Sequence, residues 1–471
     1  MKKNIGFKYF YKLLSVSVLY TLLTVFPLYA QTPVEEDDFL TSGFYGGGLS
    51  FIDGSAYARV QLQPDIPLGN FGFGLDLVFL FNPYAEGDEP RFLAEDGETW
   101  DSASTWLRLI RYIRYAQPYD PFYFRLGEFD YLTIGHGSIM SGYSNHDRRG
   151  LHLNVRESDG KYGIETMLND LGNPRIFGGR GFVRPLLRPE NNNLFTRFEL
   201  GATYITDIDP DSMVEGEEPF QAVGADIGFP IIERSSFRLD LYNDFAVQTA
   251  PLAPESAVME DSAPEDDTLQ SDETATDSTM VDEGETSETE VTWGNAIGIG
   301  FVANSIIFKF EYRIFDDGYI PSVFDYTYEL GMPVFWGYDK GDEARRGFFS
   351  QIILKPIPQL HLLGAFESYN DNTSKLYIGA KESGLIPRFQ FRAFYTKRNI
   401  GEDGETGFFT DLVDLDDKSA FNIEIRYEVV PPIQTILVYE YRFRRVEAED
   451  GRSHFEPFRN TSVSVGYNHD F

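Results

Sequence analysis

The chain contains no cysteine among its 471 residues. Disulfide bonds are therefore excluded, and so is a lipid anchor attached through a cysteine side chain. Basic residues are also in short supply, because 40 Lys and Arg stand against 74 Asp and Glu and leave a net charge of −34. Nucleic-acid binding needs a basic surface, so we expect no nucleic-acid partner.

Long apolar runs are missing after residue 30. A membrane-spanning helix needs about 18 consecutive apolar residues, and the later runs are short, as at 77–81. In lipid, only helices and closed barrels satisfy every backbone hydrogen-bonding group. If this chain enters a membrane, it therefore does so as strands.

The first thirty residues differ in composition from the rest. They begin with four lysines, continue with the apolar stretch 13–29 and end at Ala30, before the polar Gln31. This order of charge, apolar core and small residue is typical of a secretory signal peptide. The alternative is an N-terminal membrane anchor, but the acidic stretch 35–38 that follows favours export. We expect 1–30 to be a cleaved signal peptide and 31–43 a periplasmic segment.

Aromatic residues are abundant, with 41 Phe, 28 Tyr and 4 Trp, and they recur in alternating patterns. In 306–314, Phe308 and Phe310 fall on one face of a strand, and Lys309 and Glu311 on the other. A soluble β-sandwich alternates too, with its apolar face inward. Many rings on the apolar face and both signs of charge on the polar face favour a barrel in lipid.

The connections between these segments alternate in length. Short links fall at 303–305, 356–358, 383–387 and 431–432, and long polar links fall at 83–104, 130–147, 207–218, 249–290, 316–345, 398–418 and 446–458. Short periplasmic turns and long extracellular loops are the pattern of transmembrane barrels. We predict an all-β fold over 44–471, a transmembrane antiparallel β-barrel of about 20 strands, within a range of 16–22. The predicted strands lie near 44–52, 56–63, 70–82, 105–116, 122–129, 148–156, 160–168, 176–187, 194–206, 219–229, 235–248, 291–302, 305–315, 346–355, 359–368, 374–382, 387–397, 419–430, 433–445 and 459–471.

The last predicted strand ends the sequence with alternating apolar residues. Val463, Val465, Tyr467 and Phe471 share one face. This pattern resembles the terminal signature of bacterial outer-membrane β-barrels, porin-like proteins among them, which the barrel-assembly machinery reads as an insertion signal. His469 departs from the aromatic residue usual at its place. The resemblance implies a protein of the Gram-negative outer membrane, in contact with its lipid and lipopolysaccharide.

The polar faces of the strands supply candidate pore-lining residues. A barrel of about twenty strands is wider than its side chains can fill, and fixed charges in a narrow pore select solutes by charge. The alternative is that these charges pair with one another and stiffen the interior. The candidates are Arg108, Arg114, Arg125, Arg197, Glu199, Arg238, Asp240, Lys309, Glu311, Arg313, Arg392, Glu424, Arg426, Glu440, Arg442 and Arg444.

One long link, 127–150, is rich in Gly and Ser and less charged than the others. Glycine lets a backbone pass close to another surface. We predict that 130–147 folds into the barrel and narrows it, much as one loop does in general porins, the alternative being a hairpin standing outside. The candidate constriction residues are Gly135, His136, Ser138, Tyr143, Asn145, His146 and Asp147.

The same segment permits an enzymatic alternative. His136 and Ser138 are two residues apart, which resembles the His-x-Ser pair of outer-membrane lipid hydrolases. In that reading Ser138 is the nucleophile, His136 the base, and Asp130 or Asn145 orients the histidine. Those hydrolases are small barrels, so we do not expect an enzyme. His136, His146 and Asp147 match no established metal-ligand spacing, so we expect neither a metal nor a cofactor.

The link at 249–290 is strongly acidic, with fourteen Asp and Glu and no Lys or Arg in 251–290. This composition is typical of a disordered, solvated loop. A sharper alternative is weak binding of divalent cations near lipopolysaccharide, although the loop lacks the spacing of a calcium site.

We predict a passive outer-membrane channel for small polar solutes. Residues 31–43 are too few for a plug domain, which argues against an energised transporter. The runner-up is a non-conducting barrel that presents its surface loops, as an adhesin or structural protein does, and a lipid hydrolase is third. The sequence leaves the solute and a homo-oligomeric state open.

Overall fold

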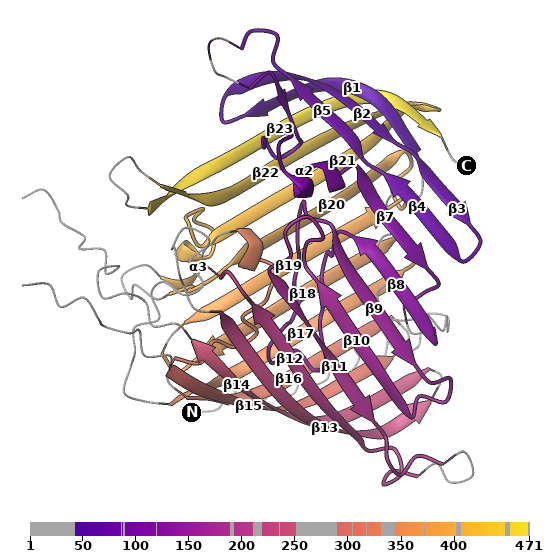
Figure 1. Ribbon diagram of the computed structural model, residues 1–471, viewed down its shortest axis with the longest axis vertical. Coiled ribbons are helices and arrows are strands. Elements are labelled where there is room, and N and C mark those ends of the chain that lie inside the picture. Colours follow the sequence, from indigo (N-terminus) through magenta and orange to yellow (C-terminus); the bar gives the residue numbers. More distant parts are fainter. Residues whose placement is uncertain are drawn as a thin grey trace, which may run out of the picture.

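The computed structural model describes residues 43–469, apart from 86, 88–89, 119, 189–192, 211–218, 235, 251–289, 304, 317, 331–343, 372, 402–406 and 448–452. The segment 1–30 that is expected to be a signal peptide, nearly all of the acidic loop and the terminal Phe471 lie outside the described residues. The described part is almost wholly β-structure (Figure 1). Across these ranges, no helix has the length and apolar character needed to cross a membrane.

The strands of the first half all belong to a single antiparallel sheet. They are β1 (Gly43–Ile52), β2 (Ser55–Gln63), β3 (Asp65–Leu68), β4 (Phe71–Leu75), β5 (Leu77–Phe81), β6 (Phe92–Leu93), β7 (Ile110–Tyr115), β8 (Phe122–Gly127), β9 (Gly150–Arg156), β10 (Tyr162–Leu168), β11 (Ile176–Val183) and β12 (Glu199–Asp207).

The second half continues the sheet with longer strands. They are β13 (Phe220–Arg234), β14 (Phe237–Ala250), β15 (Glu290–Ala303), β16 (Ile306–Phe315), β17 (Arg345–Ile357), β18 (Leu360–Tyr369), β19 (Ser374–Ser383), β20 (Phe389–Lys397), β21 (Ser419–Val430), β22 (Ile433–Glu447) and β23 (Ser453–His469). The helices are short: α2 (Ala103–Leu107), α3 (Phe408–Asp411) and the 3₁₀ turn η2 (Tyr328–Leu330).

The sheet closes into a barrel because its last strand pairs with its first. Gly43 faces His469, and the ladder continues to Ile52 opposite Asn460. β2 and β3 together form one strand that is interrupted at Pro64, and β4 and β5 form another that is interrupted at Asp76. These two interrupted strands pair with each other as one hairpin. Leaving out the two-residue β6, the ring has twenty strands, which confirms the predicted fold class and strand number.

The register separates an outer from an inner face. Ile299 lies opposite Phe310, and both side chains are exposed on the outer face. The neighbouring pair, Gly300 opposite Lys309, lies on the inner face. Val463, Val465 and Tyr467 are exposed on the outer face, while Ser462 and Ser464 beside them are buried. An apolar outside and a polar inside are what a barrel in lipid requires.

Two predicted strands begin later in the chain than expected. Residues 103–107 form α2, where the Ser102 side chain accepts a hydrogen bond from the Thr105 amide and caps the helix, so β7 starts only at Ile110. β12 starts at Glu199, and Arg197 lies in the turn before it. A local cap and a turn therefore override the alternating pattern at these two places.

The connections alternate in length along much of the ring. Long links leave one end, hereafter the long-loop end, and mostly short turns join strands at the other. Links 370–373 and 448–452 at the long-loop end are short, and two further links break the pattern. The turn from β1 to β2 is tight although it lies at the long-loop end, with Asp53 and Gly54 at positive φ. The link 184–198 is long although it lies at the short-turn end.

Candidate functional site

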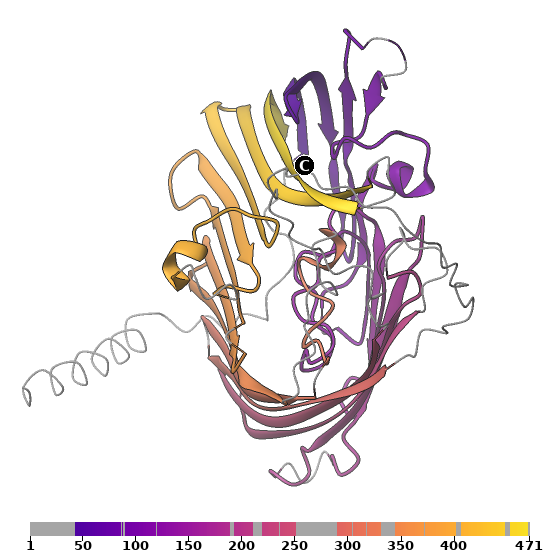
Figure 2. The same ribbon diagram turned by 90° about the vertical axis from the view of Figure 1, so that its left-hand side faces the viewer.

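Two links from the long-loop end fold back into the barrel. The first, segment A (residues 128–149), joins β8 to β9, and the second, segment B (residues 316–330), follows β16. Both are seen inside the ring of strands in Figure 2. Their side chains are largely buried; Phe129, Met140, Tyr143 and Phe324 are fully enclosed. Segment A therefore lies in the lumen rather than standing outside as a hairpin.

The two segments pair with each other. The amide of Ser141 donates to the carbonyl oxygen of Phe324 at 3.0 Å. The amide of Phe324 donates to the carbonyl oxygen of Ile139 at 3.2 Å. The Ser322 amide likewise donates to the Ser138 carbonyl oxygen at 2.8 Å. Backbone groups buried in the lumen need such partners, because water is largely excluded there. Segment B thus supports segment A, and neither is a bare loop.

Carboxylates of segment B fasten the pair to the wall. Glu329 accepts hydrogen bonds from Asn169 at 2.8 Å and from Arg175 at 3.2 Å, and it forms an ion pair with Arg148. Burial raises the pKa of Glu329, but the two arginines outweigh it and hold the pKa below its ordinary range. Asp325 is bound in the same way by Lys375 and Arg398.

Glycines of β15 make room for rings on the inner wall. A Cβ at Gly298 would lie 2.1 Å from the Tyr242 ring, and one at Gly294 would lie 2.6 Å from the Tyr319 ring. The freed Tyr242 stacks on His136 of segment A, with ring centroids 4.0 Å apart, and its hydroxyl donates to Glu311 at 2.7 Å. The glycines of β15 therefore leave a part of the inner wall without side chains, and rings of the wall and of segment B pack against it.

The inserted segments fill one side of the lumen with an apolar core. Ile139, Met140 and Phe324 pack there against inward residues of the wall such as Met167 and Ile205. Beside this core a cavity of about 670 Å³ remains, bordered by segment A and by strands around the ring, among them β2, β8, β14 to β16 and β17 to β22. The lumen is therefore only partly filled by the inserted segments.

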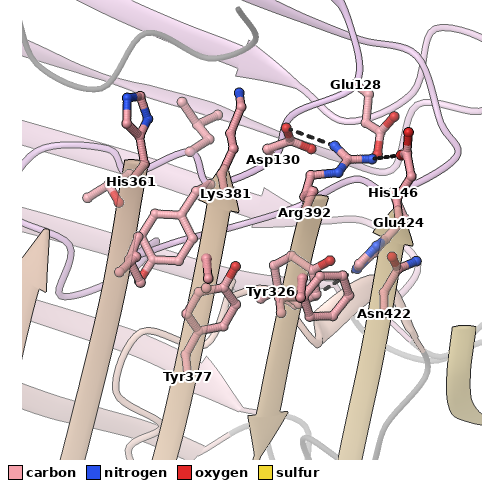
Figure 3. A pocket seen from close by; sticks show the side chains of 18 of the residues that line it. Glu128, Asp130, His146, Tyr326, His361, Tyr377, Lys381, Arg392, Asn422 and Glu424 are labelled. Carbon is pink, nitrogen blue, oxygen red and sulfur yellow. Dashed lines mark hydrogen bonds and ion pairs between the residues drawn. The ribbon is translucent and has the colours of Figure 1, made fainter. Parts of the chain in front are cut away.

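Three basic side chains lie side by side on the wall of this cavity. His361, Lys381 and Arg392 stand opposite one another on β18, β19 and β20, as Figure 3 shows. The Arg392 guanidinium lies between Asp130 of segment A, at 3.6 Å, and Glu424 of β21, at 3.3 Å. Positive charge on the wall therefore faces negative charge on the inserted segment.

Segment A contributes acids whose protonation differs. Burial and the neighbouring Asp130 raise the pKa of Glu128 well above its ordinary range. Burial also raises the pKa of Asp147, but Arg108 and Arg442 outweigh it and hold this pKa below its ordinary value. Asp147 therefore keeps its charge beside the two arginines, whereas Glu128 favours the neutral form.

A cluster of aromatic rings lies beside the three basic side chains (Figure 3). Tyr326 packs against Phe394 with ring centroids 4.3 Å apart, and against Tyr377 at 5.2 Å. Tyr131 of segment A contacts Tyr377 at 5.1 Å, and its hydroxyl accepts a hydrogen bond from Gln351 at 3.0 Å. The cavity therefore has an aromatic patch beside its charged one.

The predicted pore-lining residues divide into two groups. Nine border the cavity: Arg108, Arg125, Asp240, Lys309, Arg392, Glu424, Arg426, Glu440 and Arg442. The other seven do not border it: Arg114, Arg197, Glu199, Arg238, Glu311, Arg313 and Arg444. Alternation along a strand predicts which face a residue takes, but not whether another segment covers that face.

Arg313 and Glu311, two of these seven residues, form a covered ion pair. Arg313 is fully buried and bonds Glu311 and Glu367 at 2.7 and 2.8 Å. Segment B covers this pair, since Ser322 accepts a further hydrogen bond from Arg313. Arg313 and Glu311 therefore pair with each other beneath an inserted segment and do not border the cavity.

The predicted constriction residues divide likewise. Gly135, His136, His146 and Asp147 border the cavity. Tyr143 and Asn145 are fully buried behind them, and Ser138 is held through its backbone, whose amide donates to Asp244 at 3.4 Å. The side chain of Asn145 accepts a hydrogen bond from the Phe129 amide at 2.6 Å, which joins the beginning of segment A to its end.

The hydrolase alternative gains no support from these contacts. The His136 ring stacks on Tyr242 and faces Asp226 at 3.5 Å, while Asp130 pairs with Arg392. Asn145 is engaged with backbone groups. Within the ranges that the structure describes, no group of three or more His, Cys, Asp or Glu side chains is placed to hold a metal.

Segment B is the main element that the sequence prediction missed. The sequence predicts link 316–345 only as one of the long polar links, although it contains aromatic residues such as Tyr326 and Tyr328. The same aromatic content has its reason inside the lumen, where Tyr328 is buried and donates to Asp207 at 2.9 Å. His361 and Lys381, which border the cavity, were also missed.

No protein-family model and no curated protein sequence matches the chain. Solved outer-membrane structures are similar in fold. OpdK of Pseudomonas aeruginosa with vanillate has 10% identity, covering 91% of this chain and 97% of OpdK, with a TM-score of 0.28. OccAB2 of Acinetobacter baumannii has 9% identity over 92% and 99% of the chains, with a TM-score of 0.31. The ferric-catecholate import receptor Fiu of E. coli has 10% identity over 93% and 82%, with a TM-score of 0.35.

Proposed function

We propose that the protein is a passive channel of the bacterial outer membrane for small polar solutes. The observation that carries the proposal is the cavity of about 670 Å³ inside the lumen, bordered by charges of both signs. A soluble protein would gain little from an apolar outer face around a charged interior, whereas a barrel in lipid requires both. The proposed signal peptide at 1–30 supplies the route of export.

The nine cavity residues are the proposed pore lining, with His361 and Lys381 added to them. Arg392 on the wall pairs with Asp130 of segment A, and Lys381 lies beside Arg392, so a solute would pass fixed charges of both signs. Segment A is the proposed constriction, with Gly135, His136, His146 and Asp147 at its surface. A zwitterion or a small polar solute suits such opposed charges better than an ion of one sign.

The test is single-channel conductance of the refolded full chain in a planar bilayer, with ion selectivity from the reversal potential. Steady open conductance supports the channel. A barrel that inserts without conducting overturns it.

One observation favours the runner-up, a non-conducting barrel that presents its surface loops. The apolar core formed by segments A and B closes much of the lumen. Silent insertion in the bilayer experiment would therefore shift the weight to the long loops as the working surface.

A further inference from the structure

Residues 407–418, the described second part of the link between β20 and β21, lie outside the barrel, in contrast to segments A and B. Lys397 at the end of β20 lies in the same row as Leu376 and Phe366, and this row continues to the outward Phe310. Lys397 is nevertheless fully buried. The described residues 407–418, hereafter the flap, cover it from outside the barrel.

The flap is held on the outer wall by polar contacts. The Lys397 ammonium group forms ion pairs with Asp411 at 2.8 Å and Asp416 at 3.0 Å, and it donates to the Asp414 carbonyl oxygen at 2.9 Å. The hydroxyl of Tyr395, which also faces outward, donates to the Leu412 carbonyl oxygen at 2.5 Å. An ion pair buried against the wall fixes the flap in one position.

The other face of the flap is apolar and uncovered. Phe409 is 80% exposed and Val413 is 75% exposed. Leu415 and Phe408 are exposed on the same short stretch around α3. Large apolar side chains gathered at the surface of a barrel call for an apolar partner.

The exposed rings continue the lipid-facing surface of the barrel. Phe408 contacts Phe366 with ring centroids 6.3 Å apart, Phe366 contacts Phe348 at 5.9 Å, and Phe348 contacts Phe310 at 6.3 Å. Phe348 and Phe366 lie near the ends of β17 and β18 that face the long loops. Figures 1 and 2 show α3 outside the wall near that end.

We propose that the flap is a membrane anchor, which inserts Phe408, Phe409, Val413 and Leu415 among the acyl chains of the leaflet at the long-loop end. Aromatic and aliphatic side chains at this level bind the boundary between headgroups and acyl chains. The occupant is lipid because the flap extends a surface that is already lipid-facing. The proposal rests on the membrane location proposed above but not on conduction.

The chain has no cysteine, so single cysteines can carry a nitroxide without a background. Phe409→Cys is compared, in the full chain refolded into phosphatidylcholine vesicles, with Phe310→Cys as the lipid reference and Asp101→Cys as the water reference. Spin-label collision with oxygen reports lipid, and collision with a water-soluble nickel chelate reports water. The label at 409 is expected to match 310.

A label at 409 that matches 101 overturns the anchor. A label shielded from both reagents, with dipolar broadening that disappears on dilution with unlabelled chain, shows a second copy on the flap and overturns lipid as the occupant.

The fastening is tested in the same labelled protein. Asp411→Asn weakens the hold of Lys397 and is expected to raise nickel access at 409 several-fold. Asp414→Asn is the matched control, since Asp414 contributes its carbonyl oxygen to Lys397. Solute efflux from the same vesicles distinguishes the two proposals. A lipid-exposed label at 409 without efflux refutes the channel and not the anchor. Efflux with a water-exposed label at 409 refutes the anchor and not the channel.

Discussion

The carboxylate of Glu329 accepts a hydrogen bond of 2.6 Å from the hydroxyl of Tyr143, and this contact joins segment B to segment A inside the barrel. Because Glu329 also binds the wall through Asn169 and Arg175, one buried side chain couples three parts of the lumen. The position of the constriction therefore depends on a residue nearly 200 positions away in sequence.

Glu329→Gln is expected to loosen both inserted segments while the strand ladder survives. Removing one partner of a buried ion pair costs about 3–5 kcal/mol, so amide exchange in 316–330 is expected to rise about a hundredfold or more. Hydrogen–deuterium exchange read by mass spectrometry measures this, and noisier channel currents are expected to accompany it. Glu428→Gln on β21 is the control. Unchanged exchange in 316–330 would show that Glu329 does not fasten the segments.

Arg392→Gln is expected to shift the channel toward cations. Arg392 lies between Asp130 and Glu424, so its loss leaves two carboxylates facing the cavity without their shared cation. The reversal potential in a salt gradient measures the shift, and Asp130→Asn is expected to move it the opposite way. Arg388→Gln, in the exposed turn before β20, serves as control. If the two Arg variants behave alike, Arg392 does not border the conducting path.

Acidification is expected to release segment A through His146. Burial lowers the pKa of His146 from 6.5 to about 4. Between these two pKa values, His146 binds more protons when segment A is released than when segment A is docked. The free energy of docking therefore falls as pH drops from about 6.5 to about 4, and it stays constant below pH 4. The slope is on the order of 1 kcal/mol per pH unit.

The measurement for this window is amide exchange of 128–149 against pH, corrected for the intrinsic rate. His146→Asn is expected to remove the loss of docking at low pH, because asparagine does not titrate; Glu128, whose pKa is raised, then contributes only the opposite trend. A variant that keeps the full dependence would assign it to another group.

Gly298→Ala is expected to destabilise the barrel interior. Its Cβ would lie 2.1 Å from the Tyr242 ring and would push that ring off His136. Overpacking of this kind costs about 1–3 kcal/mol. Gly181→Ala is the matched control, since nothing lies within 4 Å of its Cβ. Urea unfolding in vesicles measures the difference, and equal midpoints for the two variants would contradict the close packing on β15.

Export is expected to remove residues 1–30. N-terminal sequencing of the protein recovered from the outer membrane should begin at Gln31. A chain that retains Met1 in the membrane would instead support the alternative of an N-terminal anchor.

The strand ring could be predicted from the sequence because its cause is local. A strand with lipid on one side and water or polar groups on the other must alternate, as Phe310 and Glu311 do, and each strand carries this pattern by itself. The two misplaced starts, at α2 and before Glu199, are places where a helix cap or a turn ends the alternation.

The site could be predicted only in part. Alternation placed Arg392, Lys309 and Glu424 on the inner face, and the glycines of segment A predicted its path inward. It could not show that segment B lies over Arg313, because the partner of a covered face is far away along the chain. The outward flap was missed for the same reason, since Lys397 finds its carboxylates only after the link folds back.

The barrel, its approximate strand number and the apolar or polar character of each face follow from local sequence, because strands in lipid alternate with a period of two residues. Which inward charges border a cavity and which form covered ion pairs depends instead on contacts between distant parts of the chain. That choice depends on contacts such as Tyr143 with Glu329, whose free energy comes from burying groups that lie far apart in the chain.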